Sequence, residues 1–375
     1  MSVNFESFSS KMSENKTNEF TDVELLNLRS LDVYFEILKK KFQQASEKLE
    51  GTHSFNFQLA NKNLTISSAG QSLLSLTTQA LIHLEAKSND LKEKPFTIFI
   101  WDENESGISL PNPPWLSSEN VSEDKYIQFQ LDHYFAYQFH NQSILYLYNV
   151  SENSAFCIVK DAQNLINSFI AAPFTKLISF WANKQNLNIL HAGCVSLNNK
   201  GVLIVGRGGK GKSSTSIQCI IDGLDYLSDD YLLIDITSEK TMAYSIYNSG
   251  HLELNNIENF PKIKSFIDIG DINQNNKPYL FLSPIFKDKV KRSTEIKAII
   301  VPLVTKNKSA NYYPISSVEA IKALAPTSLV QLNTRGINSL QSLANLTRKF
   351  PNFCLELGSD FEDISFTVKN IINEI

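Results

Sequence analysis

The sequence predicts two folded domains, an N-terminal α+β domain and a C-terminal α/β domain. Its 375 residues suit two domains of roughly 100–200 residues each. Short strands rich in aromatic and branched residues follow one another over 126–159, which predicts an antiparallel sheet. From residue 188 onward, strand, glycine-rich turn and helix alternate, which is typical of α/β domains. We expect a disordered tail over 1–20, the first domain over 21–160 and the second over 161–375.

Local patterns predict the elements of the first domain. Leu and Phe recur at helical spacing over 21–49, and again over 73–84. Alternating apolar residues on either side of Asn61-Lys62-Asn63 predict a β-hairpin. Further strands are expected over 96–101, 126–130, 134–140, 144–149 and 155–159. A helical region follows over 161–186, where Pro173 either kinks one helix or starts a second.

Composition narrows the functional classes. The formal net charge of −4 argues against a general nucleic-acid binder, which needs a basic face. The run Lys39-Lys40-Lys41 adjoins apolar residues and is typical of a solvated helix face. The four cysteines lie far apart in apolar stretches, so we expect core residues in a reducing, cytoplasmic compartment and no zinc site. No apolar run reaches the ~20 residues that a membrane span requires, so no membrane association is expected.

The segment Gly206 to Ser213 carries the strongest chemical signal. It matches G-x-x-x-x-G-K-[ST], and it lies between an apolar strand, 202–205, and a helix, 213–221. Such a loop points backbone N–H groups at phosphate oxygens, while its Lys contacts the β- and γ-phosphates and its Ser contacts Mg²⁺. The residues expected to bind nucleotide are Gly206, Arg207, Gly208, Gly209, Lys210, Gly211, Lys212, Ser213 and Ser214.

Two adjacent carboxylates follow the loop after one short helix. Asp229 and Asp230 interrupt an apolar stretch over 226–234. A helix over 213–222 carries the chain about 15 Å from the phosphates, and a strand of about seven residues at ~3.3 Å each brings it back. Adjacent strand residues point to opposite faces unless the chain bends, so the two carboxylates are expected to differ in role. A carboxylate beside a second carboxylate has raised proton affinity, which suits a general base.

This order of elements resembles HPr kinase/phosphorylase and the related phosphoenolpyruvate carboxykinase-like P-loop fold. The resemblance rests on Leu190-His191-Ala192-Gly193, the loop Gly206 to Ser213, and Ser228-Asp229-Asp230. It is strongest over 188–235. It implies a P-loop kinase domain that uses ATP and Mg²⁺ to phosphorylate a hydroxyl group.

The resemblance also implies roles for individual residues. Asp230 would be the proton acceptor, with His191, Lys212 and Arg292 as further catalytic residues. Arg335 is the competitor for the arginine role. Ser213, Asp229 and Glu253 would hold the metal ion.

Several alternatives remain open. The segment after the aspartates and the N-terminal domain depart from true HPr kinases, which argues against HPr as the acceptor. The acceptor hydroxyl can belong to a serine of a protein or peptide, or to a small molecule, and a homo-oligomer is compatible with the sequence. The competing functions are an ATP-binding regulatory module without catalysis and a carboxykinase-like lyase. The choice between ATP and GTP also stays open.

Lys212→Ala is expected to weaken ATP-dependent activity sharply, because Lys212 is the one loop side chain placed to reach the γ-phosphate. Calorimetry of ATP binding and turnover assays would measure the loss. Unchanged binding together with unchanged turnover would contradict the assignment of the phosphate loop.

Overall fold

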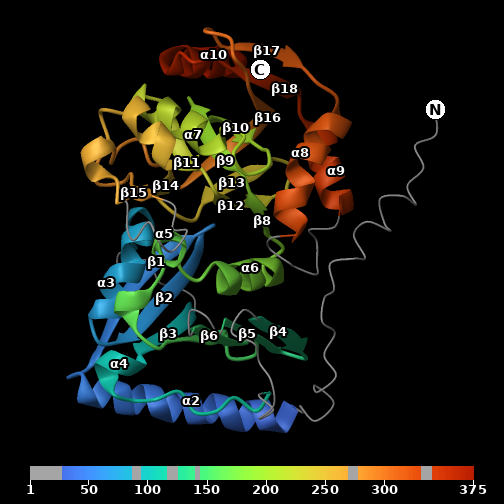
Figure 1. Cartoon of the computed structure of the whole chain (residues 1–375). Coiled ribbons are helices and arrows are strands. Elements are labelled where there is room, and N and C mark those ends of the chain that lie inside the picture. The colour runs from blue at the N-terminus through green and yellow to red at the C-terminus, as the bar shows by residue number, and fades with distance from the viewer. Residues whose placement is uncertain (1–27, 87–93, 116–125, 140–143, 269–277, 331–339) are drawn as a thin grey trace.

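The computed structural model describes residues 28–86, 94–115, 126–139, 144–268, 278–330 and 340–375. They form a mixed α/β structure with one sheet in each half of the chain (Figure 1). The predicted tail over 1–20 lies outside the described residues. None of the helices in the described ranges combines the length and apolarity that a bilayer crossing requires.

Within the described residues, seven strands of the N-terminal half form one sheet in the order β1-β2-β3-β7-β6-β5-β4. The strands are β1 (Thr52–Leu59), β2 (Lys62–Ala69), β3 (Phe96–Asp102), β4 (Tyr126–Leu131), β5 (Tyr134–Phe139), β6 (Ile144–Asn149) and β7 (Ser154–Val159). The helices are α2 (Leu28–Lys48), α3 (Ser72–Thr78), η2 (Gln79–Leu84), α4 (Glu103–Ser106), η4 (Ala162–Asn164), α5 (Asn167–Ala171) and α6 (Thr175–Lys184).

The predicted antiparallel sheet is confirmed for most of its strands, but β3 is an exception. The hairpin β1–β2 and the meander β4–β7 are antiparallel, but β3 runs parallel to both β2 and β7. The segment α3–η2 connects β2 to β3, and a connection that contains helix lets the chain return and pair in the same direction. The hairpin turn itself lies at Ala60 and Asn61, whose φ angles of 50° and 61° are typical of a two-residue type I′ turn.

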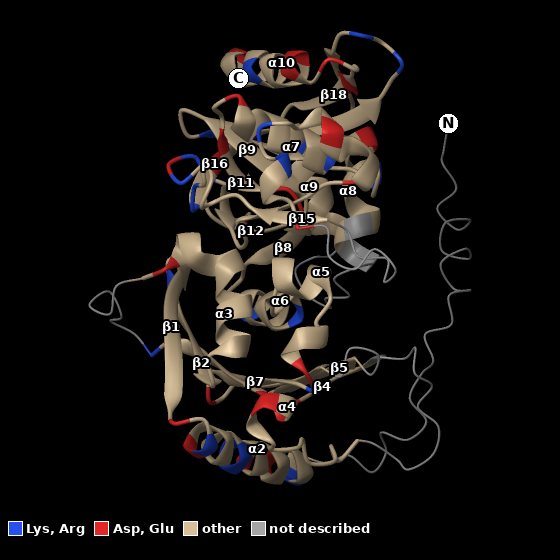
Figure 2. Cartoon of the chain, turned by 60° about the vertical axis from the view of Figure 1, so that its left-hand side comes forward, with Lys and Arg blue, Asp and Glu red and all other residues tan. Residues whose placement is uncertain are grey.

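Helices cover both faces of this sheet. On one face, α2 buries Leu31, Tyr34, Phe35 and Leu38, while its outer face carries most of the charge, as Figure 2 shows at the base of the molecule. Within the run Lys39-Lys40-Lys41, Lys39 pairs with Glu36 and Glu152.

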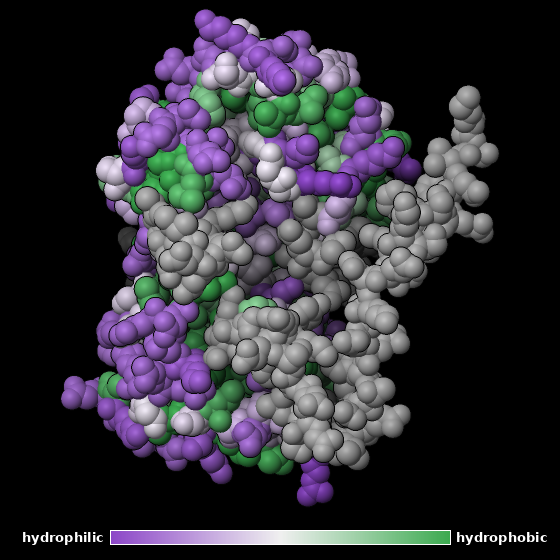
Figure 3. Space-filling model, in the orientation of Figure 1, coloured by the Kyte–Doolittle hydropathy of each residue, from purple (hydrophilic) through white to green (hydrophobic). Residues whose placement is uncertain are grey.

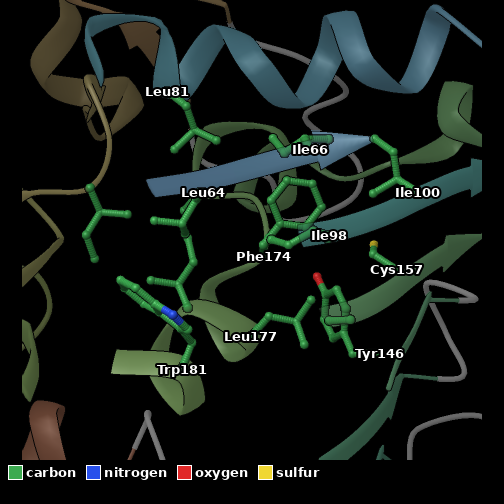
Figure 4. Packing of buried hydrophobic residues seen from close by; sticks show 14 of the residues in the cluster. Leu64, Ile66, Leu81, Ile98, Ile100, Tyr146, Cys157, Phe174, Leu177 and Trp181 are labelled. Atoms are coloured by element: carbon green, nitrogen blue, oxygen red, sulfur yellow. The ribbon is translucent and has the colours of Figure 1, made fainter. Parts of the chain in front are cut away.

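On the other face, α5 and α6 pack against the sheet. Pro173 separates these two helices, and Phe174 begins the second one at a φ of 61°. Trp181 stacks on Phe96 at 5.9 Å between ring centroids, and Figure 4 shows Leu177 and Trp181 facing the strand residues Leu64 and Ile98. The same core includes Ile189, Leu233 and Ile246 from the second half of the chain. The domain boundary at residue 161 stays a prediction, but the helices that follow it pack on the N-terminal sheet.

Nine strands of the described second half form another sheet, in which β11-β9-β10-β16-β13-β12-β8 are neighbours in that order and β18 joins β16 and β17. They are β8 (Asn188–His191), β9 (Gly193–Leu197), β10 (Lys200–Ile204), β11 (Asp225–Ser228), β12 (Tyr231–Asp235), β13 (Met242–Ser245), β16 (Ser293–Val304), β17 (Asn311–Pro314) and β18 (Asn352–Leu357). A small hairpin pairs β14 (Ser249–His251) with β15 (Tyr279–Phe281). The helices are α7 (Lys212–Ile221), η5 (Leu254–Asn259), η6 (Lys264–Phe266), α8 (Ser317–Val330), α9 (Leu340–Lys349) and α10 (Phe361–Glu374).

Hydrogen bonds from η2 join the two halves. His83 Nε2 lies 2.8 Å from Ser245 Oγ, and Asn248 Nδ2 donates to the Gln79 carbonyl at 2.7 Å. Arg292 donates to the carbonyls of His83 and Glu85, at 3.0 and 2.8 Å. The last turn of η2 is therefore bound to β13 and to the residue preceding β16.

His83 is expected to make the stability of the fold depend on pH. Burial, with the nearby charge of Arg292, lowers the pKa of His83 from 6.5 to about 3. Between these values the unfolded chain binds the extra proton, so the free energy of unfolding should rise from pH 3 to 6.5 and level off above. Urea unfolding across this range should show a flatter profile for His83→Gln, whose amide can still donate to Ser245.

Ser245→Ala is the matched control, because it removes the hydrogen-bond partner but keeps the imidazole buried. It should lower stability at every pH and retain the slope. A slope that persists in His83→Gln would contradict the role of this histidine.

Candidate functional site

The register of the second sheet brings three predicted segments to one edge. Strand β9 lies between β10 and β11 and runs antiparallel to both. Gly193 pairs with Ile204, and Cys194 pairs with Ser228. The ends of β10 and β11 therefore lie at the same edge, where β8 also ends at His191. The glycine-rich loop and the two aspartates continue from these strand ends, as their spacing in the sequence suggested.

The loop between β10 and α7 has the backbone geometry of a phosphate cradle. Gly209 and Gly211 have φ angles of 73° and 92°, in the left-handed region that favours glycine. Gly211 precedes the first residue of α7, so the amide groups of the first turn face the loop and carry the positive end of the helix dipole. A Cβ on Gly211 would lie 2.2 Å from Leu357 Cδ1, so the loop packs tightly against the end of β18.

The lysine of the loop points inward. The side chain of Lys212 is buried, and its Nζ donates to the Gly206 carbonyl at 2.9 Å. Arg207, Gly208, Gly209 and Lys210 are exposed. The ammonium group therefore lies at the centre of the cradle, where it can neutralise phosphate charge.

The two aspartates lie in a bend rather than in a continuous strand. The predicted strand over 226–234 is divided into β11 and β12, with Asp229 and Asp230 between them. Ser228 holds the bend, because its Oγ donates to the Tyr231 carbonyl at 2.8 Å and accepts from the Asp230 amide at 3.2 Å. The bend turns the two carboxylates to different partners, which fits the expectation that they differ in role.

Asp230 forms a close pair with His191. The Asp230 Oδ1 lies 2.6 Å from His191 Nε2, and the two residues are close because His191 pairs with Tyr231, the residue after Asp230. Burial raises the pKa of Asp230, but the hydrogen bond from His191 and the charges of His191, His251 and Lys212 lower it more, so the net shift is downward. The expectation of raised proton affinity is therefore wrong, because basic groups surround this carboxylate. The effect of Lys212 also places the loop lysine within electrostatic reach of Asp230.

Asp229 is bound by groups that the sequence did not reveal. It is buried, and its Oδ2 accepts from the backbone amide of His251 at 2.8 Å. The Nδ1 of His251 lies 3.8 Å from Asp229 Oδ1, and the Tyr226 hydroxyl lies 3.4 Å from the same oxygen. In the sequence, His251 was recognisable only as a polar residue after Ser249-Gly250. Nothing in the local pattern connected it to Asp229, which lies 22 positions earlier.

Helical spacing indicates which side of α7 carries Ser213. Ser213 lies one turn before Ile217 on the same helix face, and Ile217 packs on Gly250, next to His251. Ser214, the next residue, is partly exposed. Ser213 therefore lies on the side of α7 that faces β14.

The described part of the structure gives no contact to the site for two other predicted residues, Glu253 and Arg292. Glu253 is exposed after the end of β14, at the start of η5, and its role as metal ligand stays a prediction. Arg292 bonds to η2. Arg292 directly precedes β16. In that strand, Ile300 pairs with Ile204, the last residue of β10 before the loop. Arg292 is therefore eight strand positions, roughly 26 Å, from the edge where the loop begins. Its catalytic role also stays a prediction, and Arg335 lies outside the described residues.

The donor set fits Mg²⁺ bound together with a nucleotide. Ser213 and the two aspartates supply hard oxygen atoms, and Mg²⁺ in such sites takes one or two carboxylates, water and substrate phosphates. In the described ranges no cluster of three or more His, Cys, Asp and Glu residues could by itself hold a metal ion. A magnesium ion would therefore need nucleotide phosphates as additional ligands.

Comparisons with known proteins add little to this geometry. No family model matches the sequence, and no curated protein matches it. Among solved structures, the chain is similar to the Hpr(Ser) kinase/phosphatase from Coxiella burnetii, with 14% sequence identity and a TM-score of 0.29. The match covers 50% of this chain and 97% of that chain. A similarity this weak carries no argument about function, so the proposal below rests on the site itself.

The glycines of the loop offer a matched test of its geometry. Gly211→Ala should lower phosphate affinity and destabilise the fold by about 1–3 kcal/mol, because a positive φ and the contact with Leu357 both oppose a Cβ. Gly208→Ala should be close to neutral, because its φ lies outside the left-handed region and a Cβ there would meet open space. Thermal unfolding with and without ATP would compare them. Equal behaviour of the two variants would contradict the cradle geometry.

Proposed function

We propose that this chain is an ATP-dependent kinase that resembles HPr kinase and transfers the γ-phosphate to a hydroxyl group. One observation carries the proposal. The loop lysine Lys212 and the pair His191–Asp230 meet at one edge of the sheet, close enough for the lysine charge to lower the pKa of Asp230. A nucleotide-binding loop requires only the lysine. A carboxylate in close contact with an imidazole beside it is suited to hold an acceptor hydroxyl.

In this proposal the loop and α7 bind the phosphates. Backbone amides of the loop and of the first turn of α7 bind their oxygens, and Lys212 neutralises charge that develops on the transferred group. Ser213 and Asp229 would hold a magnesium ion that is bound together with the nucleotide, and the ion would supply positive charge beside the phosphates.

Asp230 handles the acceptor. Its lowered pKa keeps the carboxylate ionised at neutral pH, so it accepts a hydrogen bond from the hydroxyl and orients the attacking oxygen. The proton passes to Asp230 as the new oxygen–phosphorus bond forms and the bond to the leaving nucleoside diphosphate breaks. His191 positions this carboxylate through the 2.6 Å contact. The acceptor is a serine hydroxyl of a protein or peptide, or an alcohol of a small molecule.

Asp230→Asn is expected to lower kcat by ~10²–10⁴-fold, the usual contribution of general-base assistance, while ATP affinity changes little. Asp229→Asn should act through the metal, so raising the Mg²⁺ concentration should partly restore its activity. Single-turnover assays of wild type and both variants across a Mg²⁺ series would separate the two roles.

The acceptor has to be found first, by incubating the protein with γ-labelled ATP and a cell extract or metabolite pool and identifying the labelled product by mass. Wild-type turnover by Asp230→Asn at saturating ATP would contradict the assignment of the base. ATP binding without any phosphorylated product would favour a regulatory module instead.

A further inference from the structure

A cleft lies between the C-terminal half of α7, the segment 259–262 and the residues that follow β16 and β18. Its volume is about 470 Å³, within the usual range for small-molecule sites. We propose that this cleft binds the nucleoside half of the nucleotide whose phosphates lie in the loop. The inference rests on the proposed function and adds to it the place of the ribose and base. Residues from three parts of the chain line the cleft: Gln218 and Ile221; Asn259, Phe260, Pro261 and Lys262; and Lys308, Ser359, Asp360, Phe361 and Glu362.

The topology of the sheet places this cleft where a nucleotide would extend. Strands β10, β16 and β18 are parallel neighbours, so the segments that follow them lie at the edge where the loop begins. Lys308 follows β16, and Ser359 and Asp360 follow β18. In open α/β sheets, ligands bind in the crevice outside the carboxyl ends of parallel strands. Along the edge of the sheet, the aspartates follow β11 on one side of β10, and β16 and β18 lie on the other side. If the γ-phosphate of a bound nucleotide points toward the aspartates, its nucleoside half extends toward β16 and β18.

The loop is linked to the cleft through the end of β18 and through α7. Gly211 packs against Leu357, which precedes the lining residue Ser359 by two positions. On the other side, Ser214, Gln218 and Ile221 lie on one face of α7 at helical spacing. Gln218 is six residues from Lys212, roughly 9 Å along the helix axis. The path from the phosphates to the cleft therefore follows this face of α7 toward the C-terminal end of the helix.

The lining combines an apolar wall with charged groups of both signs, since Lys262 and Lys308 face the cleft together with two carboxylates. Phe260 and Phe361 contact each other at 5.1 Å between ring centroids and, with Pro261, provide an apolar wall. Asp360 and Glu362 carry carboxylates, which accept hydrogen bonds and so match ribose hydroxyls and ring amino groups. Figure 3 shows a hydrophobic patch at the upper left of the surface, bordered by hydrophilic residues.

The test compares ATP with inorganic tripolyphosphate, which has the phosphates but no nucleoside. Wild type should bind ATP more tightly by about tenfold or more, equivalent to ~1.4 kcal/mol. Ser359→Trp places a large ring in the cleft from an exposed position and should reduce ATP affinity to that of tripolyphosphate. Ser265→Trp, exposed and outside the cleft, is the matched control and should keep the preference. Calorimetry measures both ligands on all three proteins.

Tripolyphosphate binding also reports whether each variant folds, because that ligand needs only the loop. If Ser359→Trp binds tripolyphosphate normally and still prefers ATP as wild type does, the cleft is not the nucleoside site and the proposed kinase function is untouched. If wild type binds neither ligand, the proposed function fails, and the nucleoside site fails with it.

Discussion

The close contact between helix α7 and strand β9 is the constraint on which the candidate site depends. A Cβ on Gly193 would lie 2.5 Å from Ser216 Oγ, so the helix can approach the strand this closely only because residue 193 is glycine. Gly193 follows His191 by two positions and pairs with the last residue of β10. The same contact therefore fixes the first turn of α7, and with it Lys212, above the edge where the histidine and the aspartates lie.

The charges at this edge compensate one another. Burying a carboxylate is costly unless it is paired or hydrogen-bonded, and both aspartates have such partners. Asp230 pairs with His191, and Asp229 accepts from the His251 amide. A bound triphosphate would add negative charge beside these carboxylates. Compensating that negative charge requires further positive charge at the same edge. The dipole of α7 and Lys212 supply part of it, and a magnesium ion would supply the rest.

The contacts between the two halves of the chain account for the position of Arg292, which has no contact with the candidate site in the described structure. Arg292 binds carbonyl groups at the end of η2, and the same turn contacts Ser245 and Asn248. Helix α6 adds an apolar contribution, because the core around Trp181 includes side chains of β8, β12 and β13. His191 ends β8 and Asp230 precedes β12, so the strands that position the pair His191–Asp230 are packed directly on the N-terminal half. Changes in that half are thus physically connected to the site.

The sequence by itself determined the features that depend on neighbours along the chain. The hairpin of β1 and β2, the meander of β4 to β7, and the strand, glycine-rich loop and helix around Gly206 to Ser213 follow from local pattern and backbone preference. The return of Asp229 and Asp230 to the loop also followed, since the length of one helix and one strand fixes how far the chain can travel. Only the tertiary structure decided the parallel pairing of β3, the partners of both aspartates, the place of Arg292 and the cleft between α7 and α10. Each of these depends on register and packing between residues far apart in the sequence, as between Arg292 and His83, and local pattern carries no record of such contacts.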